Sequence, residues 1–408
     1  MNYIKRSMED IILKASRQYP VVMLCGQRQT GKSTMLRHIS EPDRVYVSFD
    51  KIEARRLAET DPELFFETYG HKLLIDEFQR VPSILLAIKD IVDTATYASK
   101  DANGMFWLTG SQKFAMMQGV SESLAGRVAV FTMLGLAQRE IDGQESIAFM
   151  PCIEELRQKD YTPKTVYDIY ERIYQGGLPK LASEKDIDRE LYYSSYMSTY
   201  IERDVSALEG VGKLDEFAAL VTYLAANTAQ ELRYDKISSQ IGVSAPTVKS
   251  WVTILERAGI IYILHPYYNN ISKRLVKTPK CYFLDTGLAA YLTRWPTAAT
   301  LMNGSASGAF LETFVVGEIL KSYYNCGKQP DLYYYRDIDK KEIDLVMVGS
   351  DKIYPMEIKK AKNPSQPDKI FSVLEKLGLE VMPGLILCMA DKLFPIDRNT
   401  WLCPISMI

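Results

Sequence analysis

Glycine, lysine and serine are spaced near the N-terminus as in a phosphate-binding loop. An apolar stretch at residues 21–25 precedes the pattern G-x-x-x-x-G-K-S, and a helical pattern follows it. In such a strand, loop and helix, glycines adopt conformations that other residues resist, so backbone N–H groups converge on phosphate oxygens. Lys32 would reach the β- and γ-phosphates of ATP, and Ser33 would ligate Mg²⁺. The residues expected to bind the nucleotide are Gly26, Gln27, Arg28, Gln29, Thr30, Gly31, Lys32, Ser33 and Thr34.

Two adjacent carboxylates, Asp76 and Glu77, end a short apolar stretch. Asp76 would hold the magnesium ion through water, and Glu77 would orient and polarise the water that attacks the γ-phosphate. A solvated turn after a core strand would have the same pattern. The phosphate-binding pattern upstream favours the magnesium site, because both halves of a Mg·ATP site then occur in one chain.

Strand patterns at residues 44–50 and 105–111 also end in polar groups. In a doubly wound parallel sheet the carboxyl ends of the strands face the ligand, which would bring Thr109 and Ser111 near the nucleotide. Each residue would either sense the γ-phosphate or form the turn after its strand. Arg127, on an expected loop, would stabilise transition-state charge in its own or a neighbouring subunit, or lie on the surface. Only the neighbouring-subunit role requires an oligomer.

Strand patterns at residues 342–348 and 352–359 predict a β-hairpin that carries two acids and a lysine. Positions two apart on a strand face the same side, so Glu357 and Lys359 project together while Asp344 approaches from the partner strand. Two carboxylates collect one or two Mg²⁺ ions, and the lysine orients water or stabilises a pentavalent phosphate. Alternating charge on an exposed hairpin gives a similar pattern, so the alternative of no metal site stays open.

Composition and charge exclude several classes of protein. The 408 residues are 47% hydrophobic and 25% charged, with a formal net charge of −2. This composition excludes disorder, collagen and coiled coil, and the length suggests two or three domains at roughly 150 residues each. No apolar run approaches the roughly 18 residues of a membrane span, and acids at positions 9 and 10 argue against a signal peptide. Six scattered cysteines and three histidines argue against disulfides or a zinc cluster. From these features and the missing membrane span together, we expect a cytoplasmic protein without membrane contact.

Residues 236–256 have the pattern of a helix-turn-helix. Gly242 lies in the expected turn, Ser244 can cap the second helix, and Pro246 lies in its first turn, where a missing N–H costs nothing. Strand patterns at 259–264 and 280–284 would form a two-stranded wing. Residues 233–280 hold eight basic and two acidic side chains, a net charge of +6, which favours DNA contact. The second helix has few long side chains to read bases, so a packing module is the alternative.

Several segments resemble a prokaryotic group of AAA+-type ATPases whose members carry a C-terminal domain of unknown function. They are residues 28–34, 75–82, 108–111, 121–127, 176–179, 200–205 and 279–288. The resemblance covers nearly the whole chain and implies an ATPase core, a DNA-binding-like winged helix and a restriction-endonuclease-like C-terminal domain. The Asp344, Glu357 and Lys359 pattern itself resembles the nuclease core of restriction enzymes, with Glu312 as the expected helix-borne third acid and Glu318 as a substitute.

We therefore predict an α/β protein with a P-loop NTPase parallel sheet at 1–140, a helical lid at 141–215, a winged helix-turn-helix at 216–300 and a restriction-endonuclease-like α/β domain at 301–408. A Gly/Ser/Ala-rich linker is expected at 303–308. The expected function is Mg·ATP hydrolysis that controls a DNA-contacting winged helix and a nuclease-like domain. The alternatives are a nucleotide-gated interaction module with an inactive nuclease fold and, less favoured, a small-molecule kinase.

Overall fold

A parallel sheet organises the N-terminal part of the computed structural model, which describes residues 3–110, 124–184, 186–199, 212–268, 278–337, 339, 341–349, 351–364 and 370–408. The strands are β1 (Val21–Cys25), β2 (Val45–Ser48), β3 (Leu73–Asp76), β4 (Phe106–Gly110) and β5 (Val128–Thr132), in the order β2-β3-β4-β1-β5. The helices are α1 (Glu9–Ser16), α2 (Lys32–Ile39), α3 (Ile52–Thr60), α4 (Pro62–Tyr69), the 3-10 helix η1 (Phe78–Arg80) and α5 (Ile84–Tyr97).

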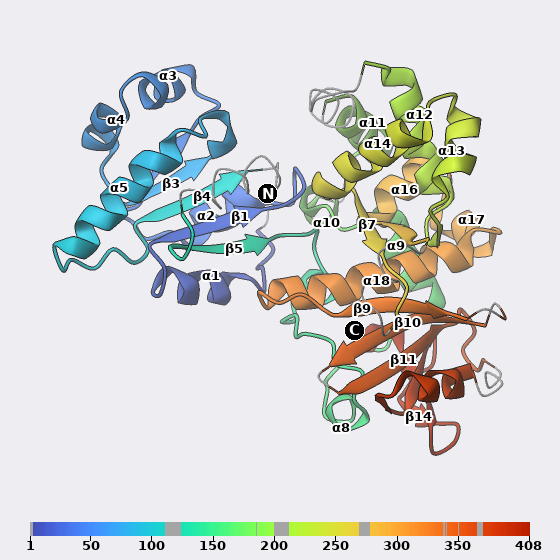
Figure 1. The fold of residues 1–408 in the computed structure, drawn as a ribbon. Coiled ribbons are helices and arrows are strands. Elements are labelled where there is room, and N and C mark those ends of the chain that lie inside the picture. Colours follow the sequence, from blue (N-terminus) through green and yellow to red (C-terminus); the bar gives the residue numbers. More distant parts are fainter. Residues whose placement is uncertain are drawn as a thin grey trace.

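Helices cover both faces of this sheet, because alternate residues of each strand point to opposite sides. Met23 of the interior strand β1 packs in a cluster that includes Phe65 of α4, whereas Leu24 packs in a second cluster with Ile12 of α1 and Leu36 of α2. Figure 1 shows α3, α4 and α5 on one side of the sheet and α1 on the other. The predicted parallel sheet of a P-loop fold is therefore confirmed.

The chain continues into helices that lie in a second body. They are α7 (Gln138–Ile141), α8 (Ile153–Leu156), α9 (Val166–Gln175), α10 (Pro179–Ser183) and α11 (Arg189–Tyr196). Thr165 and Asp168 cap α9 reciprocally, which satisfies two backbone donors at its N-terminus. The described part of the predicted helical lid thus contains the helices α8 to α11, together with loops at residues 142–152 and 157–165, and its role as a lid stays a prediction.

The residues of the helix-turn-helix pattern form two helices, α13 (Tyr234–Ile241) and α14 (Ala245–Arg257), joined by a turn. The other elements of this part of the chain are α12 (Leu214–Ala226), β6 (Gln230–Glu231), β7 (Ile261–Leu264), β8 (Lys280–Phe283), α16 (Thr286–Leu292) and α17 (Ala298–Asn303). Gly242 has a φ of +80°, which ends α13, and the Ser244 hydroxyl accepts a hydrogen bond from the Thr247 N–H at 3.3 Å. The strands expected as a wing, β7 and β8, pair antiparallel, and β6 extends them to a three-stranded sheet.

A third sheet forms the C-terminal part. Its elements are α18 (Ser307–Asn325), β9 (Leu332–Arg336), β10 (Glu342–Gly349), β11 (Lys352–Ile358), the 3-10 helix η3 (Ile370–Leu377), β12 (Glu380–Val381), β13 (Gly384–Cys388), β14 (Phe394–Pro395), β15 (Thr400–Pro404) and η4 (Ile405–Met407). The predicted hairpin is confirmed, because β10 and β11 pair antiparallel with Leu345 opposite Met356. The expected linker is shorter than predicted, since α17 includes Asn303 and α18 begins at Ser307.

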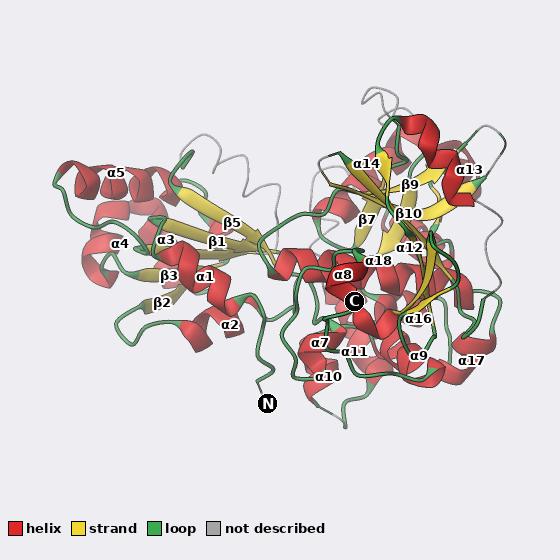
Figure 2. Ribbon diagram, turned by 90° about the horizontal axis from the view of Figure 1, so that it is seen from below, coloured by secondary structure: helices red, strands yellow, loops and turns green. Residues whose placement is uncertain are grey.

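Most buried side chains after the parallel sheet share one hydrophobic core, and two smaller clusters include residues of the C-terminal sheet. A single cluster of buried residues runs from Leu134 to Ile408 and includes residues of α9, α12, α14, α18 and β11. The two bodies lie beside each other in Figures 1 and 2. None of the helices in the described residues is both long and apolar enough to cross a membrane.

Candidate functional site

Two glycines give the phosphate-binding loop its shape. Gly26, directly after β1, has a φ of +144°, and a Cβ there would overlap the carbonyl oxygen of Met133. Gly31 has a φ of +90° and immediately precedes α2. A side chain at either position would strain the backbone, because L-residues rarely adopt these angles. The loop therefore requires glycine where the sequence pattern has it.

Lys32 is folded into this loop. Its Nζ donates hydrogen bonds to the carbonyl oxygens of Gly26 at 2.9 Å and Gln27 at 2.8 Å. The side chain is almost fully buried, and burial lowers the pKa of Lys32 to about 8, although the Glu77 carboxylate opposes this change. An ammonium group held at the start of α2, among backbone N–H groups, is placed to bind phosphate.

Ser33 and Asp76 come together as a magnesium site requires. The Ser33 Oγ donates to Asp76 Oδ1 at 2.9 Å, across the space between α2 and the end of β3. The hydroxyl of Tyr46, on β2, donates to Asp76 Oδ2 at 2.8 Å. A hydroxyl and a carboxylate in contact are the oxygen ligands that Mg²⁺ prefers, so the residues present fit this ion. Tyr46 was not predicted; its only signal was its place on the strand beside β3.

Glu77 lies beside Asp76 in a strained turn with a φ of +55°. Gln79 Nε2 donates to Glu77 Oε2, and burial raises the pKa of Glu77 above its ordinary value, an effect that this hydrogen bond opposes. Gln79 Oε1 is buried and has no hydrogen-bond partner among the described residues. Gln79 was not predicted as a site residue, although it lies two positions after Glu77.

Thr109 lies on the strand between β1, which leads into the phosphate-binding loop, and β3, which ends in Asp76. On β4 it is opposite Leu24 of β1 and Asp76 of β3. It is fully buried, yet its Oγ1 has no hydrogen-bond partner among the described residues. A buried hydroxyl costs free energy unless it is paired, so a phosphate or its water would satisfy this group. Ser111 lies outside the described residues.

Arg127 does not reach the nucleotide site of its own chain. It directly precedes β5, and its carbonyl accepts from the N–H of Val21, at the start of β1. The phosphate-binding loop follows the last residue of β1, whereas Arg127 lies beside the first residue of β1. At about 3.3 Å per residue, the length of β1 separates the two by on the order of 15 Å. Arg127 Nε pairs instead with Asp93 at 2.7 Å. The predicted role in the same subunit is therefore wrong, and the role in a neighbouring subunit stays a prediction.

The second body also contacts the loop. Gln27 Nε2 donates to the Tyr196 hydroxyl at 2.7 Å, and the Tyr192 hydroxyl donates to Gln29 Oε1. Both tyrosines belong to α11. Gly259, after α14, lies so close that a Cβ there would be 3.4 Å from the backbone N of Gln27. These contacts join distant parts of the chain and were not predicted.

A cavity of about 370 Å³ opens beside the loop. Gln29, Thr30, Gly31 and Thr34 of the loop line it, together with residues of α10 and of the N-terminal segment. The buried Arg6 Nη1 donates to the Thr30 carbonyl at 2.9 Å, and its Nε pairs with Glu140 at 3.1 Å. Arg6 thus ties the phosphate-binding loop to Glu140 of α7, a role that no local sequence pattern indicated.

The C-terminal acids also meet. Lys359 Nζ lies 2.6 Å from Glu357 Oε2 and 3.6 Å from Asp344 Oδ2. Asp344 Oδ2 accepts from the N–H of Ile358 at 2.8 Å. Glu357 is only 4% exposed, and its Oε1 has no hydrogen-bond partner among the described residues. Burial, and then the charge of Asp344, raises the pKa of Glu357 to about 7. An orphaned oxygen beside a second carboxylate fits a divalent cation.

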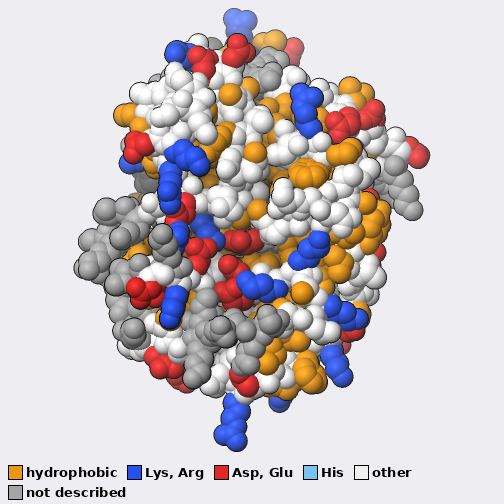
Figure 3. Space-filling model, turned by 90° about the vertical axis from the view of Figure 1, so that its right-hand side faces the viewer, with side chains coloured by type: hydrophobic (Ala, Val, Ile, Leu, Met, Phe, Trp, Pro, Cys, Tyr) orange, Lys and Arg blue, Asp and Glu red, His pale blue; other side chains and the backbone are white. Residues whose placement is uncertain are grey.

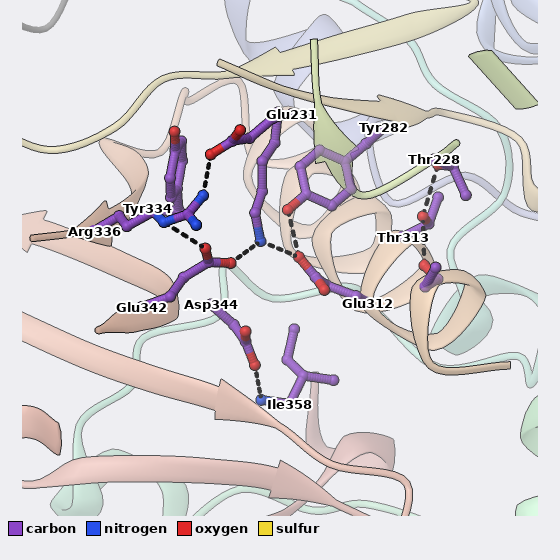
Figure 4. Close-up of polar contacts among 12 residues, drawn as sticks. Thr228, Glu231, Tyr282, Glu312, Thr313, Tyr334, Arg336, Glu342, Asp344 and Ile358 are labelled. Carbon is purple, nitrogen blue, oxygen red and sulfur yellow. Dashed lines mark hydrogen bonds and ion pairs between the residues drawn. The ribbon is translucent and has the colours of Figure 1, made fainter. Parts of the chain in front are cut away.

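Glu312, the expected third acid, contacts residues of β8 instead of Asp344 and Glu357. Glu312 Oε1 lies 3.0 Å from Lys280 Nζ and accepts from the Tyr282 hydroxyl at 2.6 Å (Figure 4). The substitute, Glu318, pairs with Lys321 at 2.7 Å and accepts from the N–H of Gln138, so it joins α18 to α7. Within the described residues, no three His, Cys, Asp or Glu side chains form a group that could hold a metal ion.

Comparison with known proteins assigns a class to the N-terminal part. Residues 18–142 match a family model described as an AAA domain. Residues 166–299 and 307–408 match two domains of unknown function, DUF8612 and DUF4143. The chain is similar to the uncharacterized protein Rv2008c of Mycobacterium tuberculosis, with 27% identity over 403 residues that cover 97% of this chain and 82% of that protein. The uncharacterized protein Mb2031c of Mycobacterium bovis has the same values.

Two solved structures are similar at low identity. The Walker-type ATPase of Pyrococcus abyssi is 15% identical with a TM-score of 0.42, covering 71% of this chain and 96% of that chain. DnaA from Aquifex aeolicus bound to AMPPCP is 14% identical with a TM-score of 0.30, covering 61% of this chain and 85% of that chain. The family match places an AAA domain at residues 18–142, and the parallel sheet with its phosphate-binding loop supports ATPase activity at that general level.

Proposed function

We propose that this protein binds Mg·ATP at residues 26–34 and hydrolyses it. The observation that carries the proposal is the 2.9 Å hydrogen bond from Ser33 to Asp76, because it joins the phosphate-binding loop to the acidic strand end. Ser33 and Asp76 would hold Mg²⁺, which neutralises charge on the phosphates. The nucleoside would occupy the cavity lined by Gln29 and Thr34.

The remaining residues of the site take separate roles in hydrolysis. Glu77, held by Gln79, orients the attacking water and accepts its proton. Lys32 moves from the carbonyls of Gly26 and Gln27 to the phosphates. Thr109, whose hydroxyl lacks a partner among the described residues, contacts the γ-phosphate or the attacking water. These roles explain why buried polar groups collect between β1, β3 and β4.

Two substitutions test the hydrolysis proposal. Lys32→Ala should lose nucleotide binding, whereas Glu77→Gln should bind ATP and trap it, with hydrolysis reduced at least a hundredfold. Nucleotide binding is measured with a fluorescent ATP analogue, and hydrolysis by phosphate release. Lys89→Ala, a lysine on α5 far from the loop in sequence, serves as the control. A Glu77→Gln protein that hydrolyses ATP at the native rate would refute the role of Glu77.

We further propose that the nucleotide state controls the second body through α11. The contacts of Gln27 with Tyr196 and of Gln29 with Tyr192 support this, because any nucleotide-induced movement of the loop must change them. Hydrogen exchange of residues 189–196, with and without ATP, tests the proposal. ATP should change their protection in the native protein, and should change it less after Tyr192→Phe and Tyr196→Phe together. Equal changes in both proteins would contradict it.

The helix-turn-helix is proposed to act as a winged helix that contacts DNA. Its exposed basic side chains Arg233, Lys236 and Lys249 line a groove of about 1000 Å³ between α13, α14 and the adjoining strands, which supports the proposal. Lys280 must be removed from the predicted basic patch, since it is buried against carboxylates. Lys273, Arg274 and Lys277 lie outside the described residues. On the face shown in Figure 3, charges of both signs are interspersed.

Salt dependence tests this contact. Duplex binding is followed by fluorescence anisotropy at several salt concentrations, with Lys236→Glu and Lys249→Glu compared with the native protein. Each lost phosphate contact should lower the slope of log affinity against log salt by about one. Binding that both variants retain in full would favour a packing module.

A second candidate function is metal-dependent nucleic-acid cleavage at Asp344, Glu357 and Lys359. The orphaned Oε1 of Glu357 favours it, because Glu357 and Asp344 would hold a divalent cation and this oxygen would then gain a partner. The cation would activate water and stabilise the leaving phosphate oxygen, while Lys359 stabilises the pentavalent phosphate. The rival is an interaction module whose terminal domain recognises a partner and cuts nothing.

Cleavage assays decide between these two readings. Supercoiled plasmid, linear duplex, single-stranded DNA and RNA are incubated with Mg²⁺ or Mn²⁺, with and without ATP, using the native protein and Asp344→Ala. Both proteins are first shown to melt at similar temperatures. Metal-dependent cutting that Asp344→Ala loses would support the nuclease. No cutting of any substrate would favour the interaction module, as would a biological readout that needs Lys32 and not Asp344.

A further inference from the structure

A lysine from the helix-turn-helix region enters the acidic site of the C-terminal sheet. Lys280 lies on β8, yet its Nζ is 3.0 Å from Glu312 on α18 and 2.8 Å from Glu342 on β10. Figure 4 labels these two acids, which lie near each other. The Lys280 side chain is 5% exposed. Burial alone would lower the pKa of Lys280, but the two carboxylates outweigh it and raise this pKa. Lys280 is therefore a buried cation shared between two acids.

The same acids are tied to β8 and its neighbours by further contacts. Tyr282, two residues after Lys280, donates to the same oxygen of Glu312 at 2.6 Å. Arg336 of β9 lies 3.7 Å from Glu342 and also pairs with Glu231 of β6. Because β6 and β8 belong to one sheet, these ion pairs fasten that sheet to the C-terminal one. Glu312 is thereby directed toward β8 instead of completing the Asp344 and Glu357 pair.

The charges around this point do not balance. Glu342 and Asp344 lie two apart on β10 and so face the same side, and Asp344 lies beside Glu357. With Glu312 and Glu231 this makes five carboxylates. The cations paired with them are Lys280, Lys359, Arg336 and Arg233, so one negative charge is left before any proton binds. The unpartnered Oε1 of Glu357 lies in the same group. Low-dielectric surroundings make a buried carboxylate oxygen without a partner costly, and a divalent cation beside Glu357 would offset this cost.

We propose that Lys280 is a lock on the divalent-cation site: it holds Glu312 on the β8 side and so keeps this acid from completing a cation site with Asp344 and Glu357. This rests on the metal site proposed above. The ammonium group and the divalent cation compete for the same acid, so the presence of Lys280 lowers the cation affinity of the site.

A double-mutant cycle on the full-length protein tests the lock. Mn²⁺ binding is measured by isothermal titration for the native protein, Lys280→Met, Glu312→Gln and the double variant. The lock predicts at least tenfold tighter Mn²⁺ binding by Lys280→Met. Glu312→Gln should change affinity less than twofold in the native background and weaken it at least tenfold in the Lys280→Met background. The control is Lys362→Met, which removes an exposed ion pair with Asp391 in the same domain.

The outcomes separate the lock from the site on which it rests. If the native protein and Lys280→Met bind Mn²⁺ equally, and Glu357→Gln abolishes binding in both, the lock is wrong and the metal site survives. If neither protein binds Mn²⁺, both are wrong. Should Lys280→Met fail to fold, Tyr282→Phe keeps every charge and removes one of the two donors to Glu312. It should tighten Mn²⁺ binding a few fold, and an unchanged affinity would overturn the lock.

Discussion

Replacement of Glu357 by glutamine should stabilise this protein at alkaline pH and leave its stability unchanged at acidic pH. Burial and the neighbouring Asp344 raise the pKa of Glu357 from 4.5 to about 7 in the folded state. Between these two values the folded protein keeps a proton that the unfolded chain releases. The contribution of Glu357 to the free energy of unfolding is therefore greatest below pH 4.5, and it is lost as the pH rises through 7. Glutamine cannot ionise, so the variant escapes this loss.

The magnitude follows from the same change in pKa. A rise from 4.5 to about 7 corresponds to roughly 3 kcal/mol between the protonated and ionised forms, at about 1.4 kcal/mol per tenfold change. Lys359, whose side chain is 44% exposed, admits water beside the carboxylate, and relaxation lowers the penalty. We therefore expect Glu357→Gln to gain about 1–3 kcal/mol at pH 8, or about 2–5 °C in melting temperature if the second body unfolds as a unit.

Differential scanning calorimetry at constant ionic strength between pH 5 and pH 8.5 measures this gain. Glu380→Gln is the control, because Glu380 is 60% exposed and its ion pair with Lys352 is 3.9 Å long. That control should show no pH-dependent difference from the native protein. Millimolar Mn²⁺ at pH 8 should stabilise the native protein and not Glu357→Gln. A variant that melts below the native protein at pH 8, or a gain equal at pH 5 and pH 8, would refute the reasoning.

Three further predictions concern the rest of the chain. Burial lowers the pKa of Lys32 to about 8, so nucleotide binding above that pH requires Lys32 to take up a proton. The Kd of a fluorescent ATP analogue should therefore rise about tenfold between pH 7 and pH 9, and a constant Kd would contradict this. Gly26→Ala should abolish nucleotide binding and lower the melting temperature, since its Cβ would overlap the carbonyl of Met133, and a native melting curve would count against the loop geometry. Asp285→Ala should cost about 3 kcal/mol by thermal denaturation, because the N–H of Gly177 loses a buried acceptor at 2.7 Å; a loss under 1 kcal/mol would show that water replaces it.

The geometry of the proposed nucleotide site was predictable because its parts are close in sequence or follow one rule of sheet geometry. Gly26 and Gly31 fix the loop through their own backbone angles, and the strand and helix beside them are their immediate neighbours. Asp76 and Thr109 end parallel strands, and the carboxyl ends of such strands meet at one edge of the sheet. Arg127 fails by the same rule, because it precedes its strand and so lies at the opposite edge.

The caps and the hairpin were also determined locally. Gly242 and Ser244 end one helix and begin the next through hydrogen bonds within a few residues. The alternating pattern of β10 and β11 fixes which side chains share a face, and a short turn fixes their register, so Asp344, Glu357 and Lys359 meet as predicted. In each case the atoms that interact are separated by so few residues that the chain has little freedom to bring other partners there.

Only the tertiary structure decided which partners the distant residues have. Glu312 looked like a metal ligand, yet it pairs with Lys280, because packing in one continuous core brings β8 against α18. The contact between Gln27 and Tyr196 joins residues 169 positions apart, and it depends on how the second body sits on the sheet. A sequence pattern specifies the charge and reach of a side chain. The order of the strands and the packing of helices determine which charge it meets, and therefore whether an acid is free to bind a cation.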